Sequence, residues 1–213
     1  MKKFIFTVPR QKSENLYKAV YKSANSTKLV NNISACFPLI PVIDSYCEDN
    51  DFAEIIALVA SQKDNICEAH DICEENLRLF WEELNEICYS KGLTCTIKRI
   101  IVPFNETLET HLATYYNLIK EIEDNDTIFA DITYGSKPIP IVEMMALGFC
   151  TKNKNNVMVE CLCYGEMDHN TNEKRLFDVT SLFYLNEISD MLSKTNISNP
   201  EDFIKKVIFK EVI

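Results

Sequence analysis

Glycine, tryptophan and long apolar runs are scarce in this sequence. Its 213 residues include 4 Gly, 7 Pro and 1 Trp, and no tract of low complexity. This composition excludes collagen-like and disordered chains. No run approaches the roughly 18 apolar residues of a membrane span. The start of the chain leads at once into a short apolar stretch, residues 4–8, without the longer apolar core of a signal peptide. We therefore expect a globular cytoplasmic protein that does not enter a membrane.

Positive charge is also scarce. The chain has 22 Lys and Arg against 32 Asp and Glu, which gives a net charge of −10. Non-specific binding to duplex nucleic acid depends on many Lys and Arg side chains that neutralise phosphates, so we expect no duplex partner. A small anionic ligand remains compatible with this charge, because net charge says little about a local pocket.

The cysteines number nine, an odd count, and most lie inside apolar segments. This pattern is typical of reduced cysteines in the core of a cytosolic protein. Apolar residues make up 46% of the chain, which is enough for one well-buried core at this length.

Short apolar segments alternate with amphipathic ones over most of the chain. The spacing predicts strands at residues 3–8, 54–60, 94–102, 128–132 and 157–163, and helices at residues 14–23, 66–89, 105–122, 138–149 and 181–192. This alternation predicts an α/β fold, a Rossmann-like three-layer sandwich with a mainly parallel central sheet. We expect one such domain over residues 1–193. Residues 194–213 are expected to be a short C-terminal helix or tail, with no separate effector domain.

Three segments are harder to interpret. Residues 37–43 are apolar but contain Pro38 and Pro41, which argues against a central strand, so we expect an ordered surface segment that covers the sheet or a partner. The polar residues 166–175 predict a loop. Residues 207–213 predict an edge strand or a tail.

The most informative stretch is residues 127–140, TIFADITYGSKPIP. A buried strand is followed by a polar loop, residues 133–137, in which Gly135 permits a tight turn, and by a helix that Pro138 begins and Ser136 can cap. Free N–H groups at a helix start, together with the Lys137 ammonium, suit an anion. The loop therefore predicts a phosphate-binding turn, although an ordinary strand-to-helix turn fits the same residues.

Three expected strand ends carry polar turns, at residues 7–12, 133–137 and 164–168. In open parallel sheets, ligands bind beyond the carboxyl ends of strands, where the strand order reverses. If the first and fourth expected strands are neighbours there, their loops face one pocket.

The segment from Asp131 to Pro138, DITYGSKP, and the later Cys163-Tyr164-Gly165 resemble the CRISPR-associated Rossmann-fold (CARF) sensor family. The order of elements over residues 1–190 is similar to that family as well. The resemblance implies a homodimer that binds a cyclic oligoadenylate, with cyclic tetra-adenylate the first candidate, in the antiviral signalling of type III CRISPR systems. Family members usually carry an effector domain after the sensor, whereas about twenty residues follow the last core helix here. A separate effector protein is therefore an expected partner.

The resemblance also implies which residues bind the ligand. By position these are Thr7, Pro9, Arg10, Gln11 and Lys12 in the first loop, Thr133, Tyr134, Gly135, Ser136 and Lys137 in the second, and Tyr164 and Gly165 after the fifth strand. Lys137 and backbone N–H groups would hold phosphates, Tyr134 would stack on adenine, and Ser136 or Thr7 would bond a ribose hydroxyl.

Three other functions stay open. A metal-independent ring nuclease would use the same pocket: a ribose 2′-hydroxyl attacks the adjacent phosphate to give a 2′,3′-cyclic phosphate, with Lys137 and Ser136 as catalytic residues and Thr7 orienting the ribose. A Rossmann-like enzyme would take another phosphorylated small molecule. A structural module would use residues 37–43 as its contact surface. We expect no cofactor for the functions that follow from the resemblance, namely binding or cleavage of the cyclic oligoadenylate.

Other residue clusters have plainer explanations. Cys67, His70 and Cys73 are metal-capable types, but the sequence has no second Cys/His pair at zinc-finger spacing, so a structural role is favoured and no metal is expected. Residues 168–169, an Asp-His pair, could act as acid and base, although a solvated loop pair is favoured.

Two carboxylates stand out in apolar segments. Glu143, alone in its apolar helix, could face solvent, a dimer partner or Lys137. Asp131 is expected to fix the loop through hydrogen bonds.

Overall fold

The computed structural model describes the chain except residues 31, 62–67, 104, 169–170, 172 and 210–213. The described chain forms two compact units, Met1–Thr180 and Ser181–Ile213. The expected boundary at residue 193 differs from this division by the length of one helix, α5 (Thr180–Ser193).

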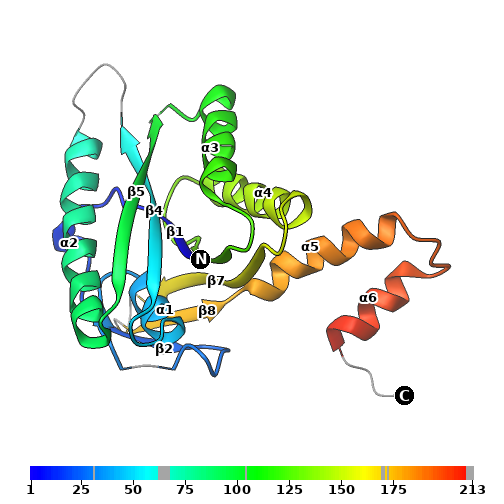
Figure 1. Cartoon of the computed structure of the whole chain (residues 1–213), viewed down its shortest axis with the longest axis horizontal. Coiled ribbons are helices and arrows are strands. Elements are labelled where there is room, and N and C mark those ends of the chain that lie inside the picture. Colours follow the sequence, from blue (N-terminus) through cyan, green and yellow to red (C-terminus); the bar gives the residue numbers. More distant parts are fainter. Residues whose placement is uncertain (31, 62–67, 104, 169–170, 172, 210–213) are drawn as a thin grey trace. The chain divides into compact units, whose positions relative to one another are not determined.

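An eight-stranded sheet forms the centre of the first unit, with the strands in the order β3-β2-β8-β7-β6-β1-β4-β5 (Figure 1). Five of the neighbouring pairs are parallel, and the pairs β2–β3 and β7–β8 are antiparallel. The strands are β1 (Lys2–Thr7), β2 (Ala19–Ser23), β3 (Ser34–Ala35), β4 (Phe52–Ser61), β5 (Thr94–Pro103), β6 (Thr127–Asp131), β7 (Met158–Met167) and β8 (Lys174–Asp178).

Helices cover both faces of this sheet. Helix α1 (Leu39–Tyr46) contacts α2 (Glu68–Lys91), and α3 (Leu108–Glu121) contacts α4 (Pro138–Asn153). Figure 1 shows α2 on one side of β4 and β5, with α3 and α4 on the other. The predicted Rossmann-like three-layer sandwich with a mainly parallel sheet is therefore confirmed. The second unit contains α5 and α6 (Pro200–Phe209), and no helix of the described chain is both long and apolar enough to cross a membrane.

Aromatic side chains hold the central strands between the helix layers. The ring of Phe4 stacks on that of Phe129 at 4.5 Å between centroids, and Phe6 stacks on Phe80 of α2 at 4.3 Å. These strands are buried on both faces, which explains why they are continuous apolar runs in the sequence. The eight cysteines among the described residues are all free, and six of them are buried.

The helix predicted for residues 14–23 is wrong. Only residues Ser13–Asn15 form a short 3-10 helix, and Ala19–Ser23 form β2. Along β2 the side chains alternate, with Val20 exposed and Tyr21 buried, and Tyr21 lies opposite Lys174 of β8. Because β8 comes so much later in the chain, this pairing has no local signature near β2.

Residues 37–43 cover the sheet, as predicted, but they are buried and do not form a surface segment. These residues enter a buried helix, α1, in which Leu39, Ile40, Val42 and Ile43 are all at most 1% exposed. Pro38 is the N-cap and Pro41 lies in the first turn, where a missing N–H group costs nothing. The prolines thus exclude a strand, as predicted, but permit a helix start.

Two further segments differ from the sequence prediction. Strand β7 continues to Met167 and β8 begins at Lys174, so the two ends of the predicted loop at residues 166–175 belong to an antiparallel pair of strands. Residues 207–209 belong to α6 and not to a strand, and residues 210–213 lie outside the described chain.

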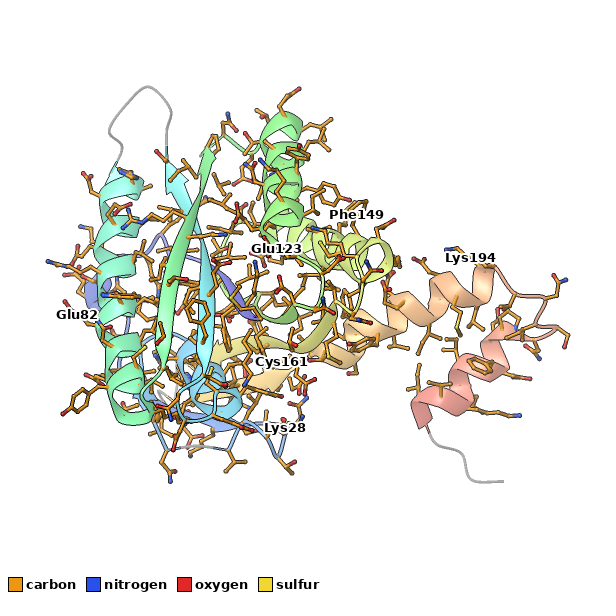
Figure 2. All side chains as sticks on the ribbon, viewed as in Figure 1. Lys28, Glu82, Glu123, Phe149, Cys161 and Lys194 are labelled. Atoms are coloured by element: carbon orange, nitrogen blue, oxygen red, sulfur yellow. The ribbon has the colours of Figure 1, made fainter. Side chains whose placement is uncertain are left out.

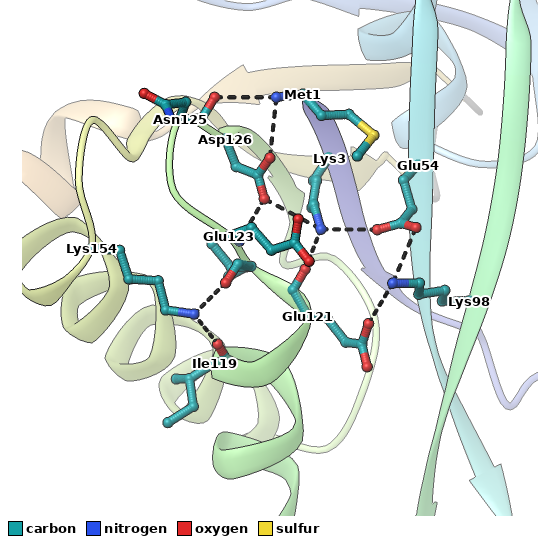
Figure 3. A network of polar contacts seen from close by, with 11 residues as sticks. Met1, Lys3, Glu54, Lys98, Ile119, Glu121, Glu123, Asn125, Asp126 and Lys154 are labelled. Atoms are coloured by element: carbon teal, nitrogen blue, oxygen red, sulfur yellow. Dashed lines mark hydrogen bonds and ion pairs between the residues drawn. The ribbon is translucent and has the colours of Figure 1, made fainter.

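A cluster of charged residues joins the amino ends of the central strands (Figure 3). The Lys3 side chain is 1% exposed, and its Nζ lies 3.0 Å from Glu54 Oε2 and 3.3 Å from Asp126 Oδ2. Lys98 of β5 adds a second cation, 3.3 Å from Glu54 Oε1 and 2.8 Å from Glu121 Oε2. A buried charge of this kind is tolerated only when it is paired.

We expect the substitution Lys3→Met to lower the free energy of unfolding by about 3 kcal/mol, because it leaves Glu54 and Asp126 buried without their shared cation. Urea unfolding would measure the loss. Lys98→Met is the matched control: Lys98 is 46% exposed and pairs with the same Glu54, so its loss should stay below about 1 kcal/mol. Equal losses of unfolding free energy in the two variants would contradict the idea that the burial of Lys3 makes its ion pairs more important.

Candidate functional site

The candidate site lies where the strand order reverses. Strand β1 pairs with β4 on one side and with β6 on the other, and the sheet grows outward from both neighbours through β5 and β7. The predicted adjacency of the first and fourth expected strands is therefore confirmed. Their loops touch, since a Cβ atom on Gly135 would lie 3.3 Å from Thr7 Cγ2. This edge is the usual ligand position in open α/β sheets.

Asp131, the last residue of β6, organises the second loop. Its Oδ1 accepts hydrogen bonds from the Thr133 backbone N–H, at 2.9 Å, and from the Thr133 hydroxyl. The Thr133 hydroxyl oxygen in turn accepts a bond of 2.7 Å from the backbone N–H of Gly165 in β7. The expected structural role of Asp131 is confirmed, and the same chain of bonds ties the loop to β7.

The two glycines of the site serve different purposes. Gly135 has φ +109°, a conformation that L side chains rarely adopt, so it makes the turn possible. Gly165 is buried, and a Cβ atom there would come within 2.5 Å of the Pro38 ring. Gly165 is thus required by the packing of α1 against β7, and its N–H group is already bonded to Thr133.

The start of α4 differs from the prediction in one respect. The N-cap residue is Lys137, with no side-chain cap, and the Ser136 hydroxyl instead donates to Glu106 Oε2 at 2.8 Å. The expected Ser136 cap is therefore wrong. The Lys137 side chain is exposed, and no carboxylate of the described residues pairs with it. The free N–H groups predicted for this helix start are absent, because Pro138 and Pro140 have no N–H and the Ile139 N–H donates to the Ser136 carbonyl oxygen at 2.9 Å. The Lys137 ammonium alone keeps the anion-binding character that was predicted.

The backbone of the first loop is held by a residue that sequence analysis missed. Asn76 of α2 is fully buried, and its Nδ2 donates to the carbonyl oxygens of Pro9, at 2.9 Å, and Gln11, at 2.8 Å. A polar side chain between the buried Cys73 and Phe80 on one helix face is a signal that could have identified it.

Thr7 and Pro9 support the site from below. Both are buried, and the Thr7 hydroxyl donates to Glu143 Oε1 at 2.9 Å. Neither lines a cavity of the site, so the structure places both behind the surface that a ligand would touch.

A cavity of about 730 Å³ lies on one side of the loops, and we call it the tyrosine cavity. It is lined by Tyr17, Tyr21, Tyr134 and Tyr164, together with Gln11, Asn15, Leu16, Thr133, Gly165, Glu166, Met167 and Lys174. Lys174 is buried in its wall, with Nζ 3.3 Å from the carbonyl oxygens of Ala35 and Cys36 and 4.8 Å from the Tyr21 ring centre. Desolvation lowers the pKa of Lys174.

A second, more open cavity of about 610 Å³ is lined by polar residues of both loops, and we call it the anion cavity. It is lined by Arg10, Asn105, Glu106, Ser136, Lys137 and Pro138. Each loop contributes to both cavities, so the single predicted pocket is divided in two. Lys12 is exposed and lines neither cavity.

Glu106, just after β5, is the second residue that sequence analysis missed. Its Oε2 accepts from Ser136 and lies 3.1 Å from His111 Nε2, and its Oε1 lies 3.6 Å from Arg10 Nη1. Partial burial would raise the pKa of Glu106, but the hydrogen bonds from Ser136 and His111 and the Arg10 charge lower it. No sequence motif marks this residue, because its partners come from three separate segments.

Two buried carboxyl groups lie beneath the second loop. Burial raises the pKa of Asp131 to about 6 and that of Glu143 to about 8, and the charge of Asp131 adds to the latter shift. Within the described chain, Asp131 Oδ2 and Glu143 Oε2 have no hydrogen-bond partner. From the sequence, Glu143 could have faced solvent or Lys137. It faces neither, because its side chain lies inside the unit and accepts the Thr7 hydroxyl at the end of β1.

The competing clusters gain no chemistry from the structure. Cys67 and His169 lie outside the described residues. Over the described part of the chain, no group of three or more His, Cys, Asp or Glu side chains could hold a metal ion. Asp168 accepts a bond of 3.3 Å from the Thr171 backbone N–H, a contact within its own turn.

No protein-family model matches the chain, and a search of curated proteins found no match either. The resemblance to CARF sensors therefore stays a prediction from the sequence.

We expect Glu143→Gln to change the pH dependence of stability. Between its usual pKa of 4.5 and its raised pKa of about 8, Glu143 keeps its proton in the folded protein but loses it in the unfolded chain. Wild-type stability from this group therefore falls as the pH rises through that range, whereas glutamine does not titrate. Urea unfolding across the range should show the variant gaining on the wild type with rising pH.

Glu109→Gln, at an exposed carboxylate of α3, is the control and should shift stability by a constant amount. A difference between Glu143→Gln and wild type that does not vary with pH would contradict a protonated Glu143 in the folded protein.

Proposed function

We propose that this protein binds a cyclic oligoadenylate, the signal of type III CRISPR antiviral defence, across a homodimer. One observation carries the proposal: the touching loops after β1 and β6 line an aromatic cavity and a cationic cavity at the same sheet edge. Nucleotides pair an aromatic base with an anionic phosphate. A cyclic oligonucleotide repeats a base and a phosphate at every nucleotide, which suits an aromatic cavity next to a cationic one.

The residue chemistry of the cavities supports this ligand class. Tyrosine rings stack on nucleobases. This stacking depends little on which base is bound, so it gives little base specificity. Arg10 offers a planar donor fork and Lys137 a point charge for phosphodiester oxygens. The same groups would also hold the phosphate if the ring were cleaved, so turnover must be measured separately from binding.

An exposed apolar surface on α3 and α4 supports the homodimer. Leu108, Leu112 and Tyr116 recur every four residues along α3, and Ile141, Met145 and Phe149 do so along α4, and all six are exposed. We call these six residues the apolar helix face. The Tyr115 and Phe149 rings, 6.2 Å apart, join the two helices. Contiguous apolar patches of this kind mark protein interfaces.

The position of this face fits a second copy of the chain. Helix α4 carries the apolar helix face along its length and lines the anion cavity at its first residue, Pro138. A two-fold axis beside α4 would therefore bring two anion cavities together, and a ring with rotational symmetry suits such an arrangement.

Isothermal titration with cyclic tri-, tetra- and hexa-adenylate tests the ligand. We expect one ring bound per dimer, and Lys137→Ala should weaken binding at least about tenfold because it removes the unpaired ammonium of the anion cavity. Lys28→Ala is the control, since Lys28 is an exposed lysine paired with Glu160 and lines neither cavity.

The outcomes separate the rival functions. Chromatography of the same samples would show any cleavage of the ring. Binding of a mononucleotide by a monomer would favour a Rossmann-like enzyme instead, and no binding of any ring would remove the proposed ligand.

Sedimentation equilibrium tests the dimer. Met145→Glu should shift the protein to monomer, because it places a charge in the centre of the apolar helix face, which a dimer would bury. Tyr89→Glu, at a 94% exposed position on α2, should leave the association state unchanged. A wild type that is monomeric at all concentrations, or a dimeric Met145→Glu, would contradict this interface.

A further inference from the structure

Glu106 places a carboxylate inside the anion cavity. The cavity is otherwise suited to a negative ligand, with Arg10 and Lys137 in its wall. Glu106 Oε2 accepts the Ser136 hydroxyl at 2.8 Å, and Oε1 lies 3.6 Å from Arg10. The two oxygens of one carboxylate thus engage one group from each of the two loops.

These contacts are the ones that a phosphodiester would use. A phosphate has the same kind of paired anionic oxygens as a carboxylate, and both bind guanidinium and hydroxyl donors in the same geometry. A phosphate and the Glu106 carboxylate cannot both occupy the donors of Ser136 and Arg10, and they repel each other at that distance.

The Glu106 side chain has room to leave. It is 41% exposed, and its backbone has φ +49°, an uncommon conformation for a residue other than glycine. Its remaining partner, His111 Nε2 at 3.1 Å, belongs to α3 and does not come from either loop. Because His111 contacts the same Oε2 as Ser136, the carboxylate gives up both loop donors by turning toward solvent, to which the side chain is already partly exposed.

We propose that Glu106 acts as an internal competitor of the ligand: it binds Arg10 and Ser136 until a phosphate displaces it. Glu106 then sets the affinity of the anion cavity and excludes weakly bound anions, so that only a ligand with further contacts binds well. The inference rests on the proposed function in taking the natural anion to be a phosphodiester of the ring.

Inorganic pyrophosphate is a suitable probe, because it needs only the anion cavity. We expect Glu106→Gln to bind pyrophosphate about tenfold more tightly than wild type in isothermal titration, because a negative charge next to the bound anion is removed. Glutamine keeps an acceptor for Ser136, so the loop should stay in place. Glu109→Gln is the matched control: it makes the same change in net charge three residues further along, at an exposed position outside the cavity, and should bind as wild type does.

A second variant links the gain to Arg10. Adding Arg10→Ala to Glu106→Gln should abolish the increase, because the donor that the carboxylate had occupied is gone. Pyrophosphate binding by Glu106→Gln that is no tighter than wild type would overturn the inference, as would an equal gain in Glu109→Gln.

Parallel titrations with cyclic tetra-adenylate keep the two hypotheses apart. A gain for pyrophosphate without any ring binding would retain Glu106 as a competitor and reject only the proposed ligand.

Discussion

The parallel pairing of β1 with β6 is the constraint on which the candidate site depends. It places Phe6 opposite Asp131, so both strands end at the same level and both loops begin there. Every later feature follows from this register: the contact of Gly135 with Thr7, the bond from Thr7 to Glu143, and the division of the loop residues between two cavities. A shift by one residue would turn each side chain to the other face of the sheet and separate these groups.

An acidic protein can still present a focused site for an anion. The net charge of −10 is spread over the molecule, whereas Arg10 and Lys137 line one cavity. Not every carboxyl group near the loops carries a negative charge that would repel an anion. Burial raises the pKa of Glu143 to about 8, so at neutral pH it is largely protonated and adds little negative charge. Glu106 is the carboxylate that remains ionised at the cavity, and it is also the one that can move.

The extent of the sequence prediction follows from the range of the interactions involved. The parallel strands β1, β4 and β6 and the helix α2 have strong local patterns, because each buries a whole run or one regular face. The apolar spacing that predicted α3 and α4 marks the helices correctly, although several of those side chains are exposed. Strand β2 was missed because its pairing with β8 joins positions more than a hundred residues apart in the chain, and β8 was missed because its polar sequence resembles a loop although it pairs with the nearby β7. Helix α1 was missed because two prolines hid a buried helix start. The Ser136 cap failed for a similar reason, since the hydroxyl found a stronger acceptor in Glu106 than the helix end could offer.

The sequence by itself determined the α/β class, the order of the central elements and the position of the two loops at strand ends, because these depend on hydrophobic periodicity and on turn residues such as Gly135 and Pro138. It also predicted Lys137 as a group for an anion, and the family resemblance placed Arg10 and Ser136 among the expected ligand-binding residues. Only the tertiary structure decided that Thr7 and Pro9 are buried supports, that Asn76 holds the first loop and that four tyrosines from three segments share one cavity. It alone placed Glu106 between the two loops. The physical reason is that hydrogen bonds and ion pairs depend on distances of about 3 Å between side chains, which the sheet register and helix packing set and which no spacing along the chain records.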